Sequence, residues 1–101
     1  MATHKISVTV EADSIRVDPD SLTMTSADEV HWAGTNARKF SIVFEHDRAF
    51  GRRELDHASA TTRQKPRSRG RFKYTVVSME NRNVQLDPDI VVEEPPTGPH
   101  P

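Results

Sequence analysis

Residues 70–94 read GRFKYTVVSMENRNVQLDPDIVVEE and contain the clearest secondary-structure pattern of the chain. Apolar and polar residues alternate through residues 72–76, and after a polar loop Ile90 and Val92 occupy alternate positions of a second apolar run. Successive side chains of a β-strand point to opposite faces of the sheet, so each run is typical of a strand with one buried face. The stretch therefore predicts two strands joined by a loop.

The same alternation occurs in earlier segments of the chain. Turn signals separate the runs, such as DPD at 18–20 and SADE at 26–29. About seven short strands result, a number and spacing that favour an all-β, antiparallel sandwich of two sheets. The apolar residues of the expected strands are Ile6, Val8, Val10, Ile15, Val17, Leu22, Met24, Val30, Trp32, Phe40, Ile42, Phe44, Phe72, Tyr74, Val76, Val84, Leu86, Ile90 and Val92.

Two segments depart from this pattern. Residues 46–69 form one long connection whose only large apolar residues are Phe50 and Leu55, and such long loops are usually functional or disordered. Residues 94–101 are rich in proline and predict a disordered tail. We therefore expect a single domain over residues 1–93, with the tail outside it.

Composition narrows the class of protein. The chain has 101 residues, 34% of them hydrophobic, with a net charge of −1 and no cysteine. One thin core is expected, and disulfides and thiolate chemistry are excluded. No apolar stretch approaches the ~20 residues that a membrane span needs. The first ten residues carry no signal-peptide pattern, so the cytoplasm is the default expectation, although a mature periplasmic chain would look the same.

Four segments, taken in order, resemble the cupredoxin family. They are SLTMTSADEVHW (21–32), NARKFSIVFE (36–45), GRFKYTV (70–76) and LDPDIVVEE (86–94), with a non-matching insertion at about 46–69. The resemblance implies a Greek-key β-sandwich. It also implies a place for a copper ion at one end, held by two histidines, a cysteine and usually a methionine.

The residues at those places are not the family's ligands. Phe40 aligns with the first histidine and Val76 with the cysteine, while Met79 falls near the second histidine and Val84 near the methionine. Soft thiolate ligation is what suits such a site to both copper oxidation states. The resemblance therefore implies a cupredoxin-like sandwich in which apolar side chains fill the place of the copper ion. It also implies that the protein does not carry out blue-copper electron transfer.

Histidines outside that place suggest an alternative metal site. EHD at 45–47 and LDH at 55–57 would bring His46 and His57 together with carboxylates if the long connection folded back on itself. Removal of Met1 would leave Ala-Thr-His at the amino terminus, so that His4 could help to bind Cu(II) or Ni(II) in a square plane. The simpler interpretation is that these are solvated polar residues.

The sequence gives little support for catalysis. It has no G-x-S-x-G nucleophile elbow and no phosphate-cradling glycine pattern. Adjacent carboxylates such as Asp28 and Glu29 point to opposite faces of a strand, which is poor geometry for shared acid–base work. We therefore expect a protein that is not an enzyme and needs no cofactor.

Charge segregation is the strongest surface signal. Nine of the 14 basic residues lie between Arg48 and Lys73, and from position 63 to 73 a basic residue occupies every second position. In an extended segment they would line one side. The predicted binding residues are Arg48, Arg52, Arg53, Arg63, Lys65, Arg67, Arg69 and Arg71.

Such a stripe is typical of contact with an acidic protein surface or another anion. Alternatively, it keeps an exposed edge soluble and blocks edge-to-edge pairing. Sequence-specific nucleic-acid binding is disfavoured because the segment has few aromatic residues to stack bases. The leading hypothesis is a non-catalytic interaction module with an acidic partner. Metal handling through histidines is the alternative, nonspecific anion binding comes third, and the oligomeric state is left open.

Overall fold

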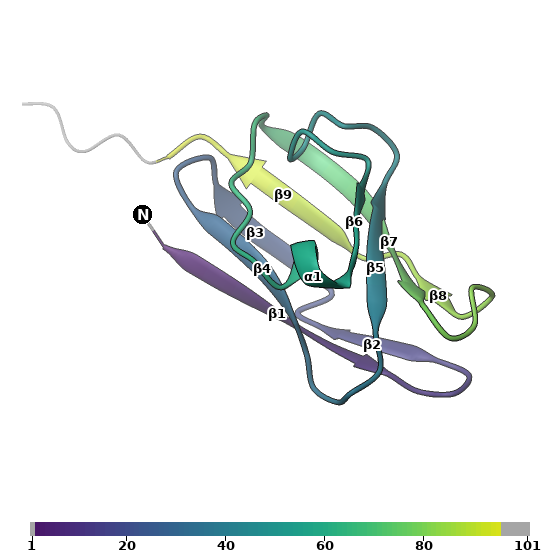
Figure 1. Cartoon of the computed structure of the whole chain (residues 1–101). Coiled ribbons are helices and arrows are strands. Elements are labelled where there is room, and N and C mark those ends of the chain that lie inside the picture. Colours follow the sequence, from purple (N-terminus) through teal and green to yellow (C-terminus); the bar gives the residue numbers. More distant parts are fainter. Residues whose placement is uncertain (1, 96–101) are drawn as a thin grey trace, which may run out of the picture.

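The computed structural model describes residues 2–95, so residues 96–101 of the predicted tail lie outside the described part. Within these residues, nine strands and one helical turn make up the fold (Figure 1). The elements are β1 (Thr3–Val10), β2 (Ile15–Asp18), β3 (Ser21–Thr25), β4 (Glu29–Gly34), β5 (Phe40–Phe44), β6 (Glu54–Leu55), α1 (His57–Ala60), β7 (Gly70–Ser78), β8 (Gln85–Leu86) and β9 (Asp89–Glu93). The prediction counted about seven strands. It did not find β6, which has only two residues, whereas its run of Val84 and Leu86 overlaps β8.

The strands form two sheets, which confirms the predicted all-β sandwich. One sheet has the order β2-β1-β4; the other has the order β3-β9-β7-β5-β6, with β8 also paired to β7. The prediction that all pairs are antiparallel is corrected at two places, because β1 pairs with β4 and β3 pairs with β9 in parallel. Alternation of apolar residues shows which face of a strand is buried but not which way the strand runs.

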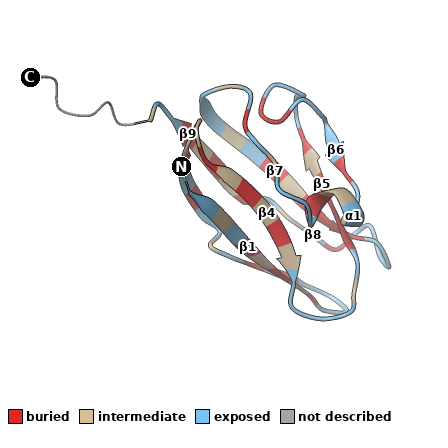
Figure 2. Cartoon of the chain, turned by 60° about the vertical axis from the view of Figure 1, so that its left-hand side comes forward, coloured by how far each residue is buried: buried red, intermediate tan, exposed pale blue. Residues whose placement is uncertain are grey.

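The core lies between the sheets, where the apolar residues of the alternating runs meet (Figure 2). Trp32 is fully buried, and its ring centroid lies 6.3 Å from Phe44, 6.1 Å from Phe50 and 5.5 Å from Tyr74 in edge-to-face contacts. The Trp32 indole N–H donates a hydrogen bond to the Tyr74 hydroxyl at 3.2 Å. Burial raises the pKa of Tyr74 to about 12, since an apolar surrounding disfavours the phenolate.

The long connection, residues 46–69, is anchored to this core along its length. We call it the basic strap. Its buried residues are Ala49, Phe50, Leu55, Ala60 and Pro66. Leu55 pairs with Ile42 on β5, and further along Gln64 exchanges two backbone hydrogen bonds with Val30 on β4, at 2.9 and 2.7 Å. The basic strap therefore crosses from the edge of one sheet to the edge of the other. Among residues 2–95, no helix is long and apolar enough to cross a membrane.

Candidate functional site

The eight predicted binding residues are all exposed in the structure. Seven lie on the basic strap, and Arg71 lies on β7. Between them, Gln64 and Ser68 are half-buried and Pro66 is buried, so the strap alternates between inward and outward positions from 63 to 69. The basic side chains at 63, 65, 67 and 69 are thus exposed at every second position, as predicted. Their role in binding stays a prediction.

A backbone contact joins the beginning of the basic strap to its end. The Arg67 amide donates to the Ala49 carbonyl at 2.7 Å, and the Gly51 amide closes a turn onto the Asp47 carbonyl at 2.7 Å. Gly51 has φ +81°, and a Cβ built there would lie 2.7 Å from Arg67 Nε. Glycine is therefore required twice at this position, once for the backbone angle and once for the close approach of a guanidinium.

The contacts that the basic side chains make within the chain are long or lie at exposed positions. Arg69 pairs with Glu94 at 3.3 Å, and both side chains are more than half exposed. Arg71 lies 3.7 Å from Asp89, and Arg52 donates to the Ser59 hydroxyl at 3.4 Å. Exposed ion pairs contribute only about 0–1 kcal/mol to stability. The basic surface can therefore exchange these contacts for those of a partner at little cost.

The helical turn α1 organises the middle of the strap. Asp56 is its N-cap and accepts a hydrogen bond from the Ser59 amide at 2.7 Å. This bond is the main reason that the pKa of Asp56 lies below its ordinary value. The helical turn is short, since α1 comprises only His57–Ala60.

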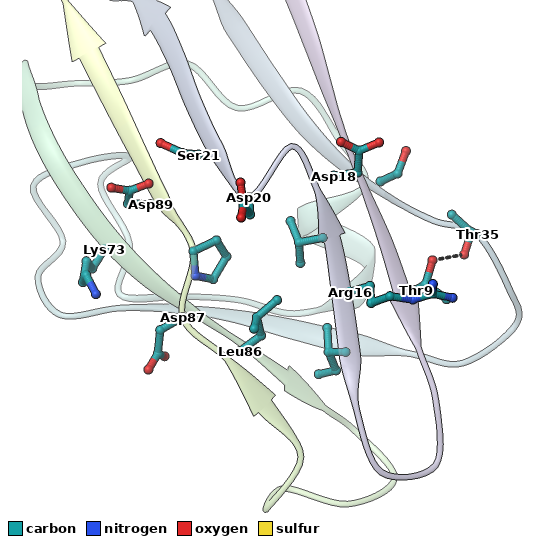
Figure 3. Close-up of a pocket in the computed structure, with 14 residues that line it drawn as sticks. Thr9, Arg16, Asp18, Asp20, Ser21, Thr35, Lys73, Leu86, Asp87 and Asp89 are labelled. Carbon is teal, nitrogen blue, oxygen red and sulfur yellow. Dashed lines mark hydrogen bonds between the residues drawn. The ribbon is translucent and has the colours of Figure 1, made fainter.

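An open groove of about 1020 Å³ lies on the side of the sandwich away from the basic strap, where β2 and β3 meet the segment before β9 (Figure 3). Two Asp-Pro-Asp sequences, 18–20 and 87–89, contribute its acidic side chains. Asp87 accepts a hydrogen bond from the Thr75 hydroxyl at 2.8 Å, and the Asp89 amide donates to the Asp20 carbonyl at 3.2 Å. Sequence reasoning noted only a turn at 18–20; the repeated motif was the available signal.

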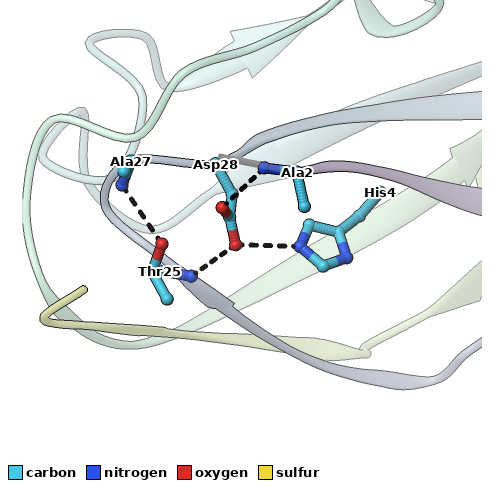
Figure 4. Close-up of polar contacts among 5 residues, drawn as sticks. All are labelled: Ala2, His4, Thr25, Ala27 and Asp28. Atoms are coloured by element: carbon cyan, nitrogen blue, oxygen red, sulfur yellow. Dashed lines mark hydrogen bonds and ion pairs between the residues drawn. The ribbon is translucent and has the colours of Figure 1, made fainter. Parts of the chain in front are cut away.

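A second polar cluster joins the N-terminal strand to the turn between β3 and β4 (Figure 4). Asp28 is buried, and its Oδ1 accepts a hydrogen bond from the Ala2 amide at 2.9 Å. Its Oδ2 accepts one from the Thr25 amide at 3.0 Å and also lies 3.0 Å from His4 Nε2. The Thr25 amide and the His4 ring hold the pKa of Asp28 well below its usual range. The cluster therefore favours an ionised Asp28.

The histidines of the two metal-site hypotheses have different surroundings. His4 is on Asp28, His46 is exposed on the basic strap, and His57 packs against Phe40. Within residues 2–95, no three or more histidine or carboxylate side chains are placed to hold a metal ion. The predicted convergence of residues 45–47 and 55–57 into such a group is therefore not observed there.

The residues aligned with the cupredoxin copper ligands have different surroundings. Phe40, Val76 and Val84 are buried in the core, whereas Met79 is 45% exposed. The Phe40 ring meets the His57 ring edge-to-face, with 4.8 Å between centroids. Three of the four positions thus belong to the apolar packing of the sandwich.

Comparison with known proteins identifies the fold. A pseudoazurin from Sinorhizobium superposes with a TM-score of 0.58 at 13% sequence identity, over 94% of this chain and 76% of that protein. A proline-to-glycine variant of amicyanin in its reduced Cu(I) form gives 0.54 at 16% identity, over 87% and 81%. A methionine-to-glutamine variant of amicyanin, also Cu(I), gives 0.54 at 16%, over 88% and 82%.

No family model matches the sequence, and no curated protein matches it. At these identities the structural likeness defines the fold, which is the cupredoxin-like β-sandwich that the sequence segments indicated. The chemistry of the solved relatives does not follow from it.

Proposed function

We propose that this protein is a non-catalytic interaction module that binds an acidic protein surface through its basic strap. The observation that carries the proposal is that seven of the eight predicted basic side chains are exposed on a backbone anchored by buried residues at Ala49, Phe50, Leu55, Ala60 and Pro66. A surface that is already ordered loses less conformational entropy when it binds than a flexible loop does. Dense positive charge then favours an acidic partner and speeds its encounter.

The proposal includes a sandwich without a type 1 copper. Such a site needs a thiolate, and the chain has no cysteine. Phe40, Val76 and Val84 present only hydrocarbon to the interior, and Met79 is directed to the surface region. The residues present therefore do not fit the copper ion of the amicyanin structures, and the sandwich serves as a scaffold for the strap.

The decisive experiment is affinity capture from host lysate after nuclease treatment, with identification by mass spectrometry. Wild type is compared with a strap variant that carries serine at Arg52, Arg53, Arg63, Lys65, Arg67 and Arg69. A matched control carries serine at exposed basic residues outside the strap, namely Lys5, Arg16, Lys39 and Arg82. Circular dichroism confirms that each variant is folded.

We expect one acidic protein to be held by wild type and by the control and to be lost from the strap variant. Equal capture by all three chains would overturn the proposal. Material that disappears after nuclease treatment, with an affinity that falls steeply with salt, would show nucleic acid binding instead.

A further inference from the structure

Four strap side chains donate hydrogen bonds to α1. They are Arg52, which donates to Ser59 Oγ at 3.4 Å, Thr61 to the Ala58 carbonyl at 2.9 Å, Thr62 to the Ser59 carbonyl at 2.7 Å, and Gln64 to the Ser59 carbonyl at 2.9 Å. Whatever holds α1 on the sandwich therefore also positions these parts of the basic surface.

His57, the first residue of α1, supplies a polar link to the sandwich. Its Nδ1 accepts a hydrogen bond from the Phe40 backbone N–H on β5 at 3.2 Å. Its half-buried ring packs edge-to-face on the Phe40 ring at 71°, and its Cε1 lies 4.0 Å from where a Cβ on Gly34 would be. Because a backbone N–H can only donate, Nδ1 must carry a lone pair, and the ring proton must be on Nε2.

We infer that neutral His57 is the positioning residue that holds α1 on β5, and that protonation of its ring releases α1 from β5. A second proton goes to Nδ1, which then points a hydrogen at the Phe40 N–H and can no longer accept. This breaks the hydrogen bond that joins α1 to β5. The inference rests on the proposed function in one respect only. If the basic strap is a docking surface, this release would weaken docking under mildly acidic conditions.

Asp56, the residue before His57, is a charged group of the same segment. Its pKa is lowered mainly by the Ser59 amide and in smaller part by the charges of Arg52 and His57, and Glu54 on β6 is exposed. On β4 and β5, Gly34 and Phe40 lie against the ring, and neither of them titrates. Protonation of the imidazole is therefore the change that would break its hydrogen bond to Phe40.

The test measures amide hydrogen exchange of Phe40 and of residues 58–64, corrected for intrinsic rates, at about pH 7.5 and pH 5.5. His57→Asn places an amide oxygen near the position of Nδ1, so it retains an acceptor that does not titrate. His57→Leu removes the acceptor. His46→Asn, at an exposed histidine of the same strap, is the matched control.

In wild type and His46→Asn we expect protection of these amides to fall at least about tenfold on acidification. In His57→Asn it should change less than about twofold, and in His57→Leu it should be low at both pH values. Protection that is independent of pH in wild type, or that falls equally in His57→Asn, would overturn the inference. If His57→Leu does not fold, wild type and His57→Asn still decide the question. The readout needs no partner, so a failure of the capture experiment would be recognised separately.

Discussion

The two lateral edges of the sandwich are finished in opposite ways. On one side the basic strap spans the edges at β6 and β4 and buries five of its side chains against the core. On the other side β2 and β3 have no second strand partner among residues 2–95, and an open groove with acidic side chains lies beside them. One side of the sandwich is thus covered by packed side chains of the strap, and the other carries charged side chains. Charge at exposed strand edges discourages edge-to-edge pairing with another chain.

The largest effect should come from removing an anchor of the closed edge. Phe50 is 5% exposed and contacts Trp32 and Phe44, so Phe50→Ala should lower the free energy of unfolding by about 3–5 kcal/mol. Leu86→Ala, at a half-buried residue of the open edge, should cost less than about 2 kcal/mol. Urea denaturation measures both. Equal losses would mean that the two edges do not differ as described.

A smaller loss should follow from a Cβ at the strap turn. Gly51→Ala should cost about 1–2 kcal/mol, because φ +81° is unfavourable for alanine and the new atom would crowd the Arg67 guanidinium. Gly34→Ala is the matched control, since its new Cβ would lie no closer than 3.4 Å to a neighbour and its φ needs no glycine. Thermal unfolding of the two variants gives the comparison. An unaffected Gly51→Ala would show that the turn is free to rearrange.

A third change affects the pH dependence of stability. Asp28 lies in the turn between β3 of the open edge and β4 of the closed edge. Because its pKa is lower in the folded chain than the ordinary value of about 3.9, the resulting stability is present above that pH and is lost as the pH falls below it. Urea midpoints between about pH 6 and pH 2 should therefore fall more steeply for wild type than for Asp28→Asn.

The exposed Asp13→Asn is the control for this measurement and should follow wild type. Parallel profiles for wild type and Asp28→Asn would show that the cluster around His4 does not form in solution.

The smallest effect on stability should come from the charges that distinguish the two edges. Serine at Arg63, Lys65 and Arg69, or asparagine at Asp18 and Asp20, should each change the free energy of unfolding by less than about 0.5 kcal/mol per site. All five side chains are exposed, so removing them uncovers no core. Chemical denaturation checks this. A loss of several kcal/mol from the strap set would assign these residues to folding and weaken their proposed role in binding.

The strands and the core could be predicted because nearly every strand has one buried face. Ile6, Trp32 and Tyr74 were identified from alternation alone, and each is buried. The exposure of the basic residues at 63–69 followed from the same argument. Anchoring of the strap could not be predicted, since Ala49, Ala60 and Pro66 look like loop residues until tertiary contacts bury them.

The groove was missed for a related reason. Its two Asp-Pro-Asp sequences lie far apart in the chain and meet through the parallel pairing of β3 with β9, in which Ser21 is opposite Asp89. Side-chain alternation carries no information about which strands are neighbours. The partners of His57 were hidden in the same way, because Phe40 precedes it by 17 positions.

The place of β9 between β3 and β7 also constrains how the chain is made in a cell. Residues 89–93 are the bridge between β3 and the rest of their sheet, so that sheet cannot close until the ribosome has released them. Until then β3 has no partner, and the nascent chain exposes an unpaired strand of alternating apolar residues. Folding of the domain is therefore expected to complete only after synthesis has passed residue 93, and a chaperone that covers exposed strands would act before that point.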